Sequence, residues 1–187
     1  QAAQVPQVLG FSQMDVPNAL IRAEELQFQV AGVQFRLCTP AGSTIVRSAL
    51  LGRHNVSNLL AVAGLLYWYG VDLDDMGAAL SNCQPPPGRL QRVPHPDQTV
   101  LIDFAHTPDA VTQVLLSLRL HCQGRLICVL GCGGDRDPGK RPLMGNAAVQ
   151  HSDLCLFTSD NPRSESPSSI IDDMCRDLVV PLDPANC

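Results

Sequence analysis

Asp160, Asn161 and Arg163 lie in one short stretch and offer a carboxylate, an amide and a guanidinium. Pro162 between them stiffens the turn, so the three groups would be presented at fixed positions. Such a set suits a zwitterion, because a carboxylate pairs with an ammonium and an arginine can hold a carboxylate through two parallel hydrogen bonds. The simpler interpretation is an Asx-turn that closes a loop, which is common for Asp-Asn-Pro taken alone.

A glycine-rich stretch at 131–142 combines close backbone approach with charge. Glycines allow the backbone to come near a ligand or to take positive φ, and Arg136, Lys140 and Arg141 could each face an anion. The stretch is not a P-loop, because Arg141 follows Lys140 where that motif requires Ser or Thr. The alternative is a solvated loop whose Asp and Arg residues pair with each other. The density of glycine and charge after a buried strand favours a ligand site.

Two further motifs are weaker when each is considered alone. Asp103 ends an apolar run and His106 lies in the following turn, so the carboxylate could accept a ribose hydroxyl or hold a water or a cation. Alone, this motif favours a loop cap instead. Asn55 and Asn58 fall on one face of an expected helix, where their amides could contact the edge of a flat base such as adenine. Alone, they favour an N-cap at Asn55 and a solvent-facing Asn58.

The elements that must position these groups alternate in the second half of the chain. Apolar runs at 99–104, 125–130 and 154–158 predict strands, and helices are expected from 108 to about 122, near 142–150 and from about Pro167. Thr107 as N-cap, Pro108 at the first helical position and Asp109 in the first turn mark the start of the first helix. The alternation predicts an α/β fold with a parallel sheet, in which ligands bind at the carboxyl ends of the strands.

The first half predicts a β-hairpin followed by two helices. Residues 25–30 and 33–38 alternate polar and apolar side chains around a tight turn at Ala31-Gly32, and 43–50 could add a third strand. The apolar period becomes helical over 55–69, which Gly70 would end, and a shorter helix is expected at 73–80. The consecutive prolines at 85–87 cannot continue a helix, so a domain boundary is expected there.

The composition of the 187 residues narrows the possible classes of protein. With 45% hydrophobic and 17% charged residues the chain can form a packed core, and a net charge of −5 argues against a general nucleic-acid binder. The longest apolar stretch, 59–69, is too short to insert across a membrane. The eight cysteines form no C-x-x-C pair and no zinc-type cluster, so we expect reduced thiols in a cytoplasmic protein.

The two ends of the chain suggest a piece of a longer protein. The first residues, from Gln1, include no starting Met and lack the basic and apolar regions of a signal peptide. The last residues follow a turn-like stretch at 181–184 directly. We therefore expect a fragment.

Taken in order, the motifs resemble those of the Mur ligases over nearly the whole chain from about Ala23 onward. The matching stretches are 52–61, 87–89, 103–109, 131–145 and 160–163. The last two are highly specific together, and they are most similar to the members that add meso-diaminopimelate to the peptidoglycan stem peptide. In this family a UDP-sugar domain, a central ATPase domain and a Rossmann-like C-terminal domain follow one another. The resemblance implies that 1–84 form the end of the central domain, a β-hairpin with helices. It implies that 88–187 form an incomplete C-terminal, amino-acid-binding domain with a parallel βαβαβα order.

The resemblance also implies roles for individual residues, although it assigns no catalytic residue and no metal ligand within the chain. The residues matching the ATP site are Asn55, Asn58, Arg89, Asp103 and His106. Those matching the diaminopimelate site are Arg136, Asp160, Asn161, Pro162 and Arg163. Arg163 is the informative residue, because the lysine-adding relatives tend to lack it.

The implied activity is that of an ATP-dependent, ADP-forming acid–amino-acid ligase of cell-wall synthesis. It would join meso-diaminopimelate to UDP-MurNAc-L-Ala-D-Glu through an acyl phosphate, with ATP and Mg²⁺ as cofactors and most Mg²⁺ ligands outside the chain. The sequence lacks the P-loop, the magnesium-binding acid, the carbamylated lysine, the UDP-sugar domain and the C-terminal Gly-Lys-Gly-His-Glu stretch of the family. We therefore expect these residues alone to have no ligase activity.

Other assignments stay open. A lysine-adding Mur ligase or a folylpolyglutamate synthase would share the fold, but Arg136 and Arg163 argue against both. A non-catalytic scaffold that keeps the ligase fold is a different class of protein. An intact G-x-x-G-K-[ST] loop upstream of the chain would argue against that scaffold.

Overall fold

The computed structural model describes residues 9–14, 16 and 19–179, and the chain divides into two compact units after Leu90. Residues 1–8, the turn predicted at 181–184 and Cys187 lie outside the described residues. In the described ranges no helix combines the length and the apolar character needed to cross a bilayer.

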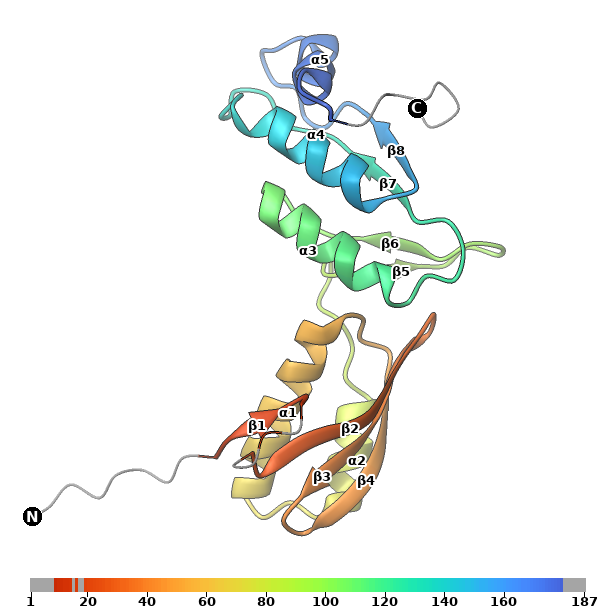
Figure 1. The fold of residues 1–187 in the computed structure, drawn as a ribbon, viewed down its shortest axis with the longest axis vertical. Coiled ribbons are helices and arrows are strands. Elements are labelled where there is room, and N and C mark those ends of the chain that lie inside the picture. Colours follow the sequence, from red (N-terminus) through yellow and green to blue (C-terminus); the bar gives the residue numbers. More distant parts are fainter. Residues whose placement is uncertain (1–8, 15, 17–18, 180–187) are drawn as a thin grey trace, which may run out of the picture. The chain divides into compact units, whose positions relative to one another are not determined.

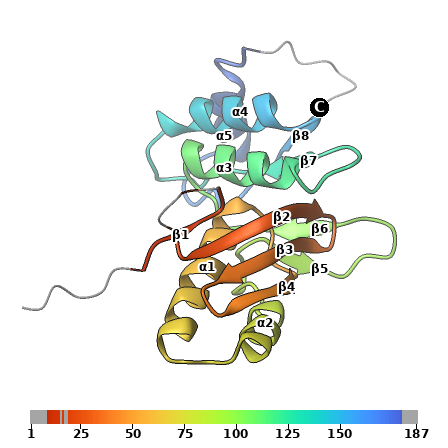
Figure 2. The ribbon, with the colours of Figure 1, turned by 60° about the horizontal axis from the view of Figure 1, so that its bottom comes forward.

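The first unit is a sheet with two helices packed on it (Figures 1 and 2). The strands are β1 (Phe11–Ser12), β2 (Ile21–Gln29), β3 (Gly32–Thr39) and β4 (Gly42–Ser48), in the order β1-β2-β3-β4. β1 is parallel to β2, and the other pairs are antiparallel. The helices are α1 (Arg53–Trp68) and α2 (Leu73–Ser81). Phe35 and Leu37 of β3, Leu60 of α1 and Met76 of α2 are buried in the core between them.

The predicted hairpin is confirmed, with a longer first strand and a turn shifted by one residue. Gln29 pairs with Gly32, so the turn is Val30-Ala31 and β2 begins at Ile21. The early part of β2 escaped detection because its alternation changes phase at a β-bulge, where the pairing register shifts between Glu24 and Gln27. Glu25, inside that bulge, has a φ of 52°.

The second unit contains one parallel strand pair and one antiparallel pair. β7 (Ile127–Leu130) and β8 (Leu154–Phe157) are parallel, and α4 (Lys140–His151) connects them. β5 (Gln91–Val93) and β6 (Val100–Ile102) are antiparallel, and α3 (Pro108–Arg119) follows β6. After β8 the chain forms α5 (Pro167–Cys175). By colour, the N-termini of α3 and α4 lie on the same side of this unit (Figure 1).

The α/β class and the strand–helix alternation are confirmed, with a difference in strand pairing. β6 pairs with β5, and the described residues contain no hydrogen-bonded ladder between β6 and β7. β5 was not predicted, because a three-residue strand with two exposed side chains carries no usable alternation. The strand predicted at 99–104 is short because the backbone turns away after Ile102, where the Asp103 carboxylate accepts a hydrogen bond from Ala105 N at 2.9 Å.

The helices of the second unit begin where local chemistry favours them. Thr107 caps α3, since its hydroxyl accepts a hydrogen bond from Ala110 N at 3.3 Å, and Pro108 occupies the first helical position. α3 packs beside α4, and α4 packs beside α5. Their inner faces bury Val111, Leu115, Met144, Ala148, Ile170 and Met174 with Cys155 of β8. This core leaves the loops at the carboxyl ends of β7 and β8 to face outward.

Candidate functional site

Two loops leave neighbouring strand ends in the second unit. We name residues 131–139, after β7, the glycine loop, and residues 158–166, after β8, the arginine loop. The parallel pairing extends to their start, since Thr158 N donates to Leu130 O at 3.0 Å. At Gly131 the loops come so close that a Cβ would lie 2.6 Å from Cβ of Asp160 and 2.7 Å from Thr158 O. This glycine is therefore required by contact between the loops.

Gly134 is the second point at which the loops meet. Its N donates to Asn161 O at 3.1 Å, and its carbonyl oxygen accepts a hydrogen bond from Nη1 of Arg163 at 2.7 Å. Asn161 and Arg163 have φ values of 46° and 52°, in the left-handed region that residues other than glycine rarely adopt. The contacts with Gly134 hold the arginine loop in this conformation, which orients the guanidinium of Arg163.

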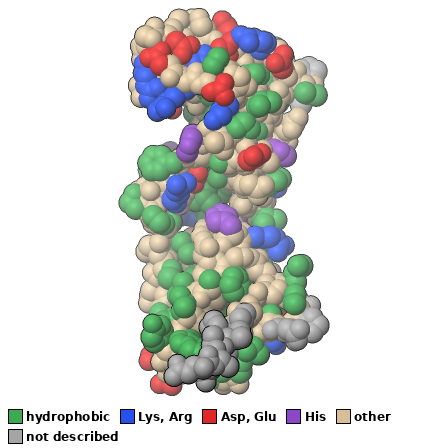
Figure 3. Space-filling model, turned by 90° about the vertical axis from the view of Figure 1, so that its left-hand side faces the viewer, with side chains coloured by type: hydrophobic (Ala, Val, Ile, Leu, Met, Phe, Trp, Pro, Cys, Tyr) green, Lys and Arg blue, Asp and Glu red, His purple; other side chains and the backbone are tan. Residues whose placement is uncertain are grey.

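Three predicted diaminopimelate-site side chains remain exposed and available. In the described part of the chain, the carboxylate of Asp160, the amide of Asn161 and the guanidinium of Arg136 form no hydrogen bond. A Cβ placed on Gly133 would lie 3.8 Å from Cγ of Arg136 and 4.0 Å from Asn161 O, so the two loops flank this glycine together. Basic and acidic side chains gather on this side of the second unit (Figure 3). The structure therefore brings Arg136, Asp160, Asn161 and Arg163 into one loop cluster, joined by the half-buried Pro162.

Arg141 does not face an anion in solution, so that expectation is wrong. Its side chain is buried, with Nη1 and Nη2 donating to the two oxygens of Glu165 at 2.8 and 2.7 Å. Nη1 also donates to Oδ2 of Asp173 at 2.9 Å. Lys140, by contrast, is exposed at the start of α4. The alternative interpretation, in which the charges of 131–142 pair with one another, is also wrong for Arg141. Its partners Glu165 and Asp173 both lie much further along the chain.

Glu165 is the partner that sequence inspection did not single out. Its Oε1 accepts a hydrogen bond from Asp135 N at 2.5 Å as well as from Arg141. The hydrogen bonds from Arg141, followed by the one from Asp135 N, lower the pKa of Glu165. A Glu that follows Ser164 in a polar loop looks like any solvated acid, so no local signal could have identified it.

The first part of the predicted ATP site also lies at a strand end. Asp103 follows β6, and its carboxylate accepts from Ala105 N, as the capping interpretation expects. Nδ1 of the exposed His106 lies 2.9 Å from Phe104 O. Thr107, next in the chain, starts α3. Asp103 and His106 are thus held by the backbone of their own turn.

The remaining predicted ATP-site residues belong to the first unit. Asn55 is not the N-cap of α1, because the helix begins one residue after Gly52 and Asn55 lies in its first turn. Nδ2 of Asn55 donates to Leu51 O at 2.8 Å, and Nδ2 of Asn58 donates to Oδ1 of Asn55 at 3.2 Å. The two amides therefore lie on one helical face as predicted. Arg89 is exposed after α2.

A shallow pocket of about 420 Å³ lies at the N-terminal end of α1. Gln13 closes one side of it, since its Nε2 donates to Arg53 O at 2.6 Å and to Ser57 Oγ at 2.5 Å. The guanidinium carbon of Arg53 lies 5.1 Å from the ring centre of Phe28. Asn55 and Asn58 do not line this pocket, whose walls are formed by Phe11, Ser12, Gln13, Met14, Arg53, His54 and Ser57.

The described residues offer neither a metal-binding cluster nor a disulfide. Within the described ranges, no group of three or more His, Cys, Asp or Glu side chains could hold a metal ion. None of the seven described cysteines forms a disulfide. Cys128 and Cys155 are direct partners across β7 and β8, and their contact lowers the pKa of Cys128. Burial raises the pKa of Cys132.

Parallel strands joined through a helix, with charged loops at their carboxyl ends, define the second unit as an α/β domain of the Rossmann type. Residues 88–182 match the family model described as "Mur ligase, glutamate ligase domain", and residues 1–66 match the "Mur ligase middle domain". The chain belongs to the Mur ligase family.

Two similar relatives and one solved structure share the same name. The chain is 46% identical over 182 residues to the UDP-N-acetylmuramoyl-L-alanyl-D-glutamate–2,6-diaminopimelate ligase of Ectopseudomonas mendocina, covering 97% of the chain and 37% of the relative. The ligase of that name from Pseudomonas aeruginosa is 48% identical over 158 residues, covering 84% of the chain and 32% of the relative. A solved structure with the same name superimposes with a TM-score of 0.74 at 39% identity, over 95% of this chain and 36% of that one. The chain thus spans about a third of the length of these relatives.

Proposed function

We propose that the chain is part of an ATP-dependent, ADP-forming ligase that joins meso-diaminopimelate to UDP-MurNAc-L-Ala-D-Glu in peptidoglycan synthesis. The observation that carries this proposal is the loop cluster of the second unit. It combines the free groups of Arg136, Asp160 and Asn161 with an Arg163 guanidinium that Gly134 O orients at 2.7 Å. The names of the relatives supply the substrate.

The chemistry of the cluster suits an amino acid with more than one charged end. Diaminopimelate carries two ammonium and two carboxylate groups, and the cluster offers one carboxylate, one amide and two guanidinium groups. A guanidinium holds a carboxylate through two parallel hydrogen bonds, which fixes the orientation of the substrate as well as its charge. Lysine lacks the second carboxylate, so it would leave one arginine without a partner. We assign the site to Arg136, Asp160, Asn161, Pro162 and Arg163.

The domain assignment follows from this function. We infer that 1–84 belong to the central domain and 88–187 to the C-terminal domain of a longer ligase, which the relatives' greater length supports. ATP would be held in part by Asn55, Asn58, Arg89, Asp103 and His106. The two amides of α1 fit a base edge, because they lie on one helical face, with Asn58 exposed. The described residues offer no cluster for Mg²⁺, so its ligands would come from other residues.

In the proposed reaction the substrate carboxylate attacks the γ-phosphate of ATP, and ADP leaves. The amino group of diaminopimelate then attacks the acyl phosphate, so that an amide forms and phosphate leaves. The residues of this chain would act by positioning the amine and neutralising charge. The 187 residues alone are expected to release no ADP with these substrates, since the sequence contains no P-loop. We place the ligase in the cytoplasm, where its nucleotide substrates are found.

Replacing Arg163 with Ala in the full-length ligase tests the proposal. We expect the KM for meso-diaminopimelate to rise by about a hundredfold, while the KM for ATP changes less than about twofold. Arg125→Ala is the matched control, because Arg125 is exposed just before β7, at the end of that strand away from the cluster. Equal effects of Arg163→Ala on both KM values would contradict the assignment, as would a wild-type enzyme that prefers L-lysine.

A further inference from the structure

A buried arginine supports the two loops of the cluster from the interior of the second unit. Arg141, at the start of α4, is 2% exposed and binds both carboxylate oxygens of Glu165, at 2.8 and 2.7 Å. Asp173 of α5 contributes a third contact, from Nη1 of Arg141 to Oδ2 at 2.9 Å. Such a two-pronged ion pair fixes direction as well as distance. The side chain of Arg141 is therefore held in one orientation by two acids.

Glu165 carries this constraint into both loops. It belongs to the arginine loop, and its Oε1 accepts Asp135 N of the glycine loop at 2.5 Å. Ser164 Oγ also donates to Oδ1 of Asp135 at 2.5 Å. Asp135 has a φ of 54°, a conformation that needs support from its surroundings in a residue other than glycine. The Arg141–Glu165 pair thus stabilises a strained residue next to Arg136.

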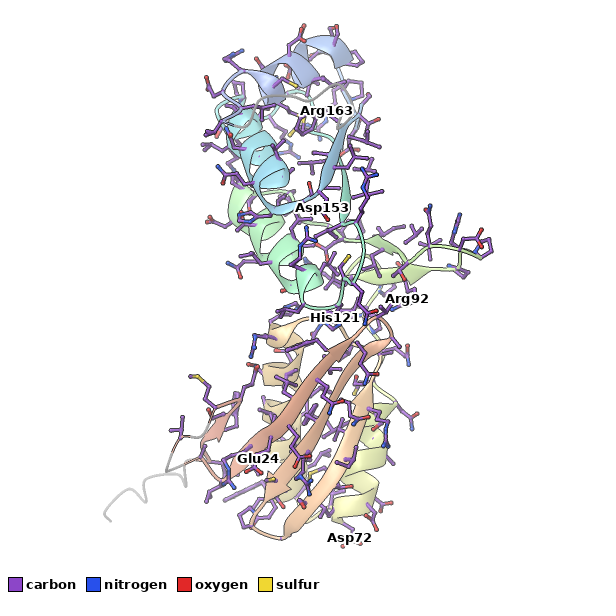
Figure 4. The ribbon with its side chains drawn as sticks, turned by 45° about the vertical axis from the view of Figure 1, so that its right-hand side comes forward. Glu24, Asp72, Arg92, His121, Asp153 and Arg163 are labelled. Carbon is purple, nitrogen blue, oxygen red and sulfur yellow. The ribbon has the colours of Figure 1, made fainter. Side chains whose placement is uncertain are left out.

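The two guanidinium groups proposed to hold substrate lie directly beside the contact between Glu165 and Asp135. Arg136 follows Asp135 in the chain, and Arg163 lies two residues before Glu165. Arg163 also donates to Gly134 O, next to Asp135. A small movement of Glu165 would therefore displace both guanidiniums with respect to each other. Figure 4 shows Arg163 beyond the carboxyl end of β8, with Asp153 at the other end of that strand.

We propose that Arg141 and Glu165 are positioning residues that set the spacing between Arg136 and Arg163, and through it the selectivity for an amino acid with two carboxylates. This inference rests on the proposed function. Neither residue touches the substrate, because Arg141 is buried and both oxygens of Glu165 are used by Arg141 and Asp135 N. A misplacement of charged groups by about 1 Å can cost on the order of a hundredfold in rate or binding.

Glu165→Gln in the full-length ligase is the main test. The amide keeps the size of the side chain and can still accept Asp135 N, but it loses the charge and one acceptor for Arg141. We expect the KM for meso-diaminopimelate to rise by about ten- to a hundredfold, with the KM values for ATP and the UDP-sugar substrate within about twofold. The preference for meso-diaminopimelate over L-lysine should fall in parallel. Arg141→Lys should act in the same direction, because an ammonium cannot form the fork.

Asp153→Asn provides a matched control. Asp153 likewise accepts from an arginine, Arg119 at 2.9 Å, and from a backbone N, Leu126 at 2.7 Å, but at the opposite end of β8. Asp153→Asn should lower the melting temperature of the ligase without changing any of the three KM values. Ser164→Ala covers the case in which Glu165→Gln fails to fold, since it removes only the exposed contact with Asp135. It should raise the KM for meso-diaminopimelate roughly threefold at an unchanged melting temperature.

The outcomes separate this inference from the proposed function. If wild-type enzyme uses meso-diaminopimelate, and neither Glu165→Gln nor Ser164→Ala changes its KM or its selectivity, the positioning role is overturned while the function stands. The same conclusion follows if Glu165→Gln raises all three KM values equally. A wild-type enzyme without activity toward meso-diaminopimelate overturns the proposed function, and this inference with it.

Discussion

Arg163 and Gly134 are joined by a hydrogen bond of 2.7 Å, from Nη1 of the arginine to the carbonyl oxygen of the glycine. This bond links loops that follow different strands, and it directs a side chain proposed to contact substrate. Gly134 also packs against the residue before Arg163, so closely that a Cβ would lie 1.8 Å from Pro162 O. The orientation of Arg163 therefore depends on the absence of a side chain 29 residues earlier.

Gly134→Ala should consequently disturb both stability and the loop cluster. The added methyl group would meet backbone atoms, which cannot rotate away, so we expect a loss of about 3 kcal/mol in the free energy of unfolding. Chemical denaturation followed by circular dichroism measures this loss. Gly124→Ala is the control, because a Cβ there meets nothing within 4 Å. Equal stability of the two variants would show that the loops do not make this contact.

The N-cap of α3 gives a prediction about local stability. Thr107→Ala removes the hydroxyl that accepts Ala110 N, so the unfolding free energy should fall by about 1 kcal/mol. Thr107→Ser should retain most of this contribution to the unfolding free energy, because serine keeps the capping hydroxyl. Ser166→Ala, at the N-cap of α5, should cost less than about 0.5 kcal/mol, since Ser166 makes no side-chain capping bond. A larger loss for Ser166→Ala than for Thr107→Ala in thermal unfolding would contradict this account.

The lowered pKa of Glu165 predicts how the stability of the protein responds to acid. Hydrogen bonds from Arg141, followed by one from Asp135 N, lower this pKa below its ordinary value of 4.5. A carboxylate with a lowered pKa stabilises the folded state above its unfolded pKa and loses this contribution as the pH falls through its folded pKa. The unfolding free energy should therefore decrease on acidification below pH 4.5.

Two variants separate the source of this acid response. Glu165→Gln removes a titrating group, so its stability should depend less steeply on pH below 4.5 than that of the wild type. Asp153→Asn should do the same at a slightly lower pH, because the ordinary value for Asp153 is 3.8 and hydrogen bonds from Arg119, then Leu126 N, lower its pKa. Urea titrations across this range measure the slopes. Parallel slopes for wild type and Glu165→Gln would exclude Glu165 as a contributor.

The two amides of α1 should differ in their structural cost. Asn55→Ala loses the bond to Leu51 O and should lower the unfolding free energy by about 1 kcal/mol, whereas Asn58→Ala loses only its contact with Asn55. If both amides contact adenine, each variant of the full-length ligase should weaken ATP binding by about tenfold in calorimetry. Asn82→Ala, an exposed amide at the end of α2, is the control. Unchanged ATP affinity in Asn58→Ala would remove it from the proposed site.

Features that depend on neighbours in the chain could be predicted from the sequence. Alternation in β3 placed Val33, Phe35 and Leu37 on the buried face, and Thr107-Pro108 located the start of α3. Both signals arise within a few residues, because they reflect side-chain period and capping. The predicted strand ends also placed the glycine and arginine loops correctly, since each follows a short apolar run. The roles of individual residues in these loops stay predictions.

Only the tertiary structure decided which polar groups are available and which are used internally. Arg136 and Arg141 stand in one charged stretch, yet Arg136 is exposed while Arg141 is buried against Glu165 and Asp173. Neither the pairing of β5 with β6 nor the contact of Gly134 with Pro162 could be predicted from the sequence. These features join residues far apart in the chain, and their partners are selected by the packing of α4, α5 and the strand ends. The sequence alone determined where the polar loops begin, and packing determined which of their charges face solvent.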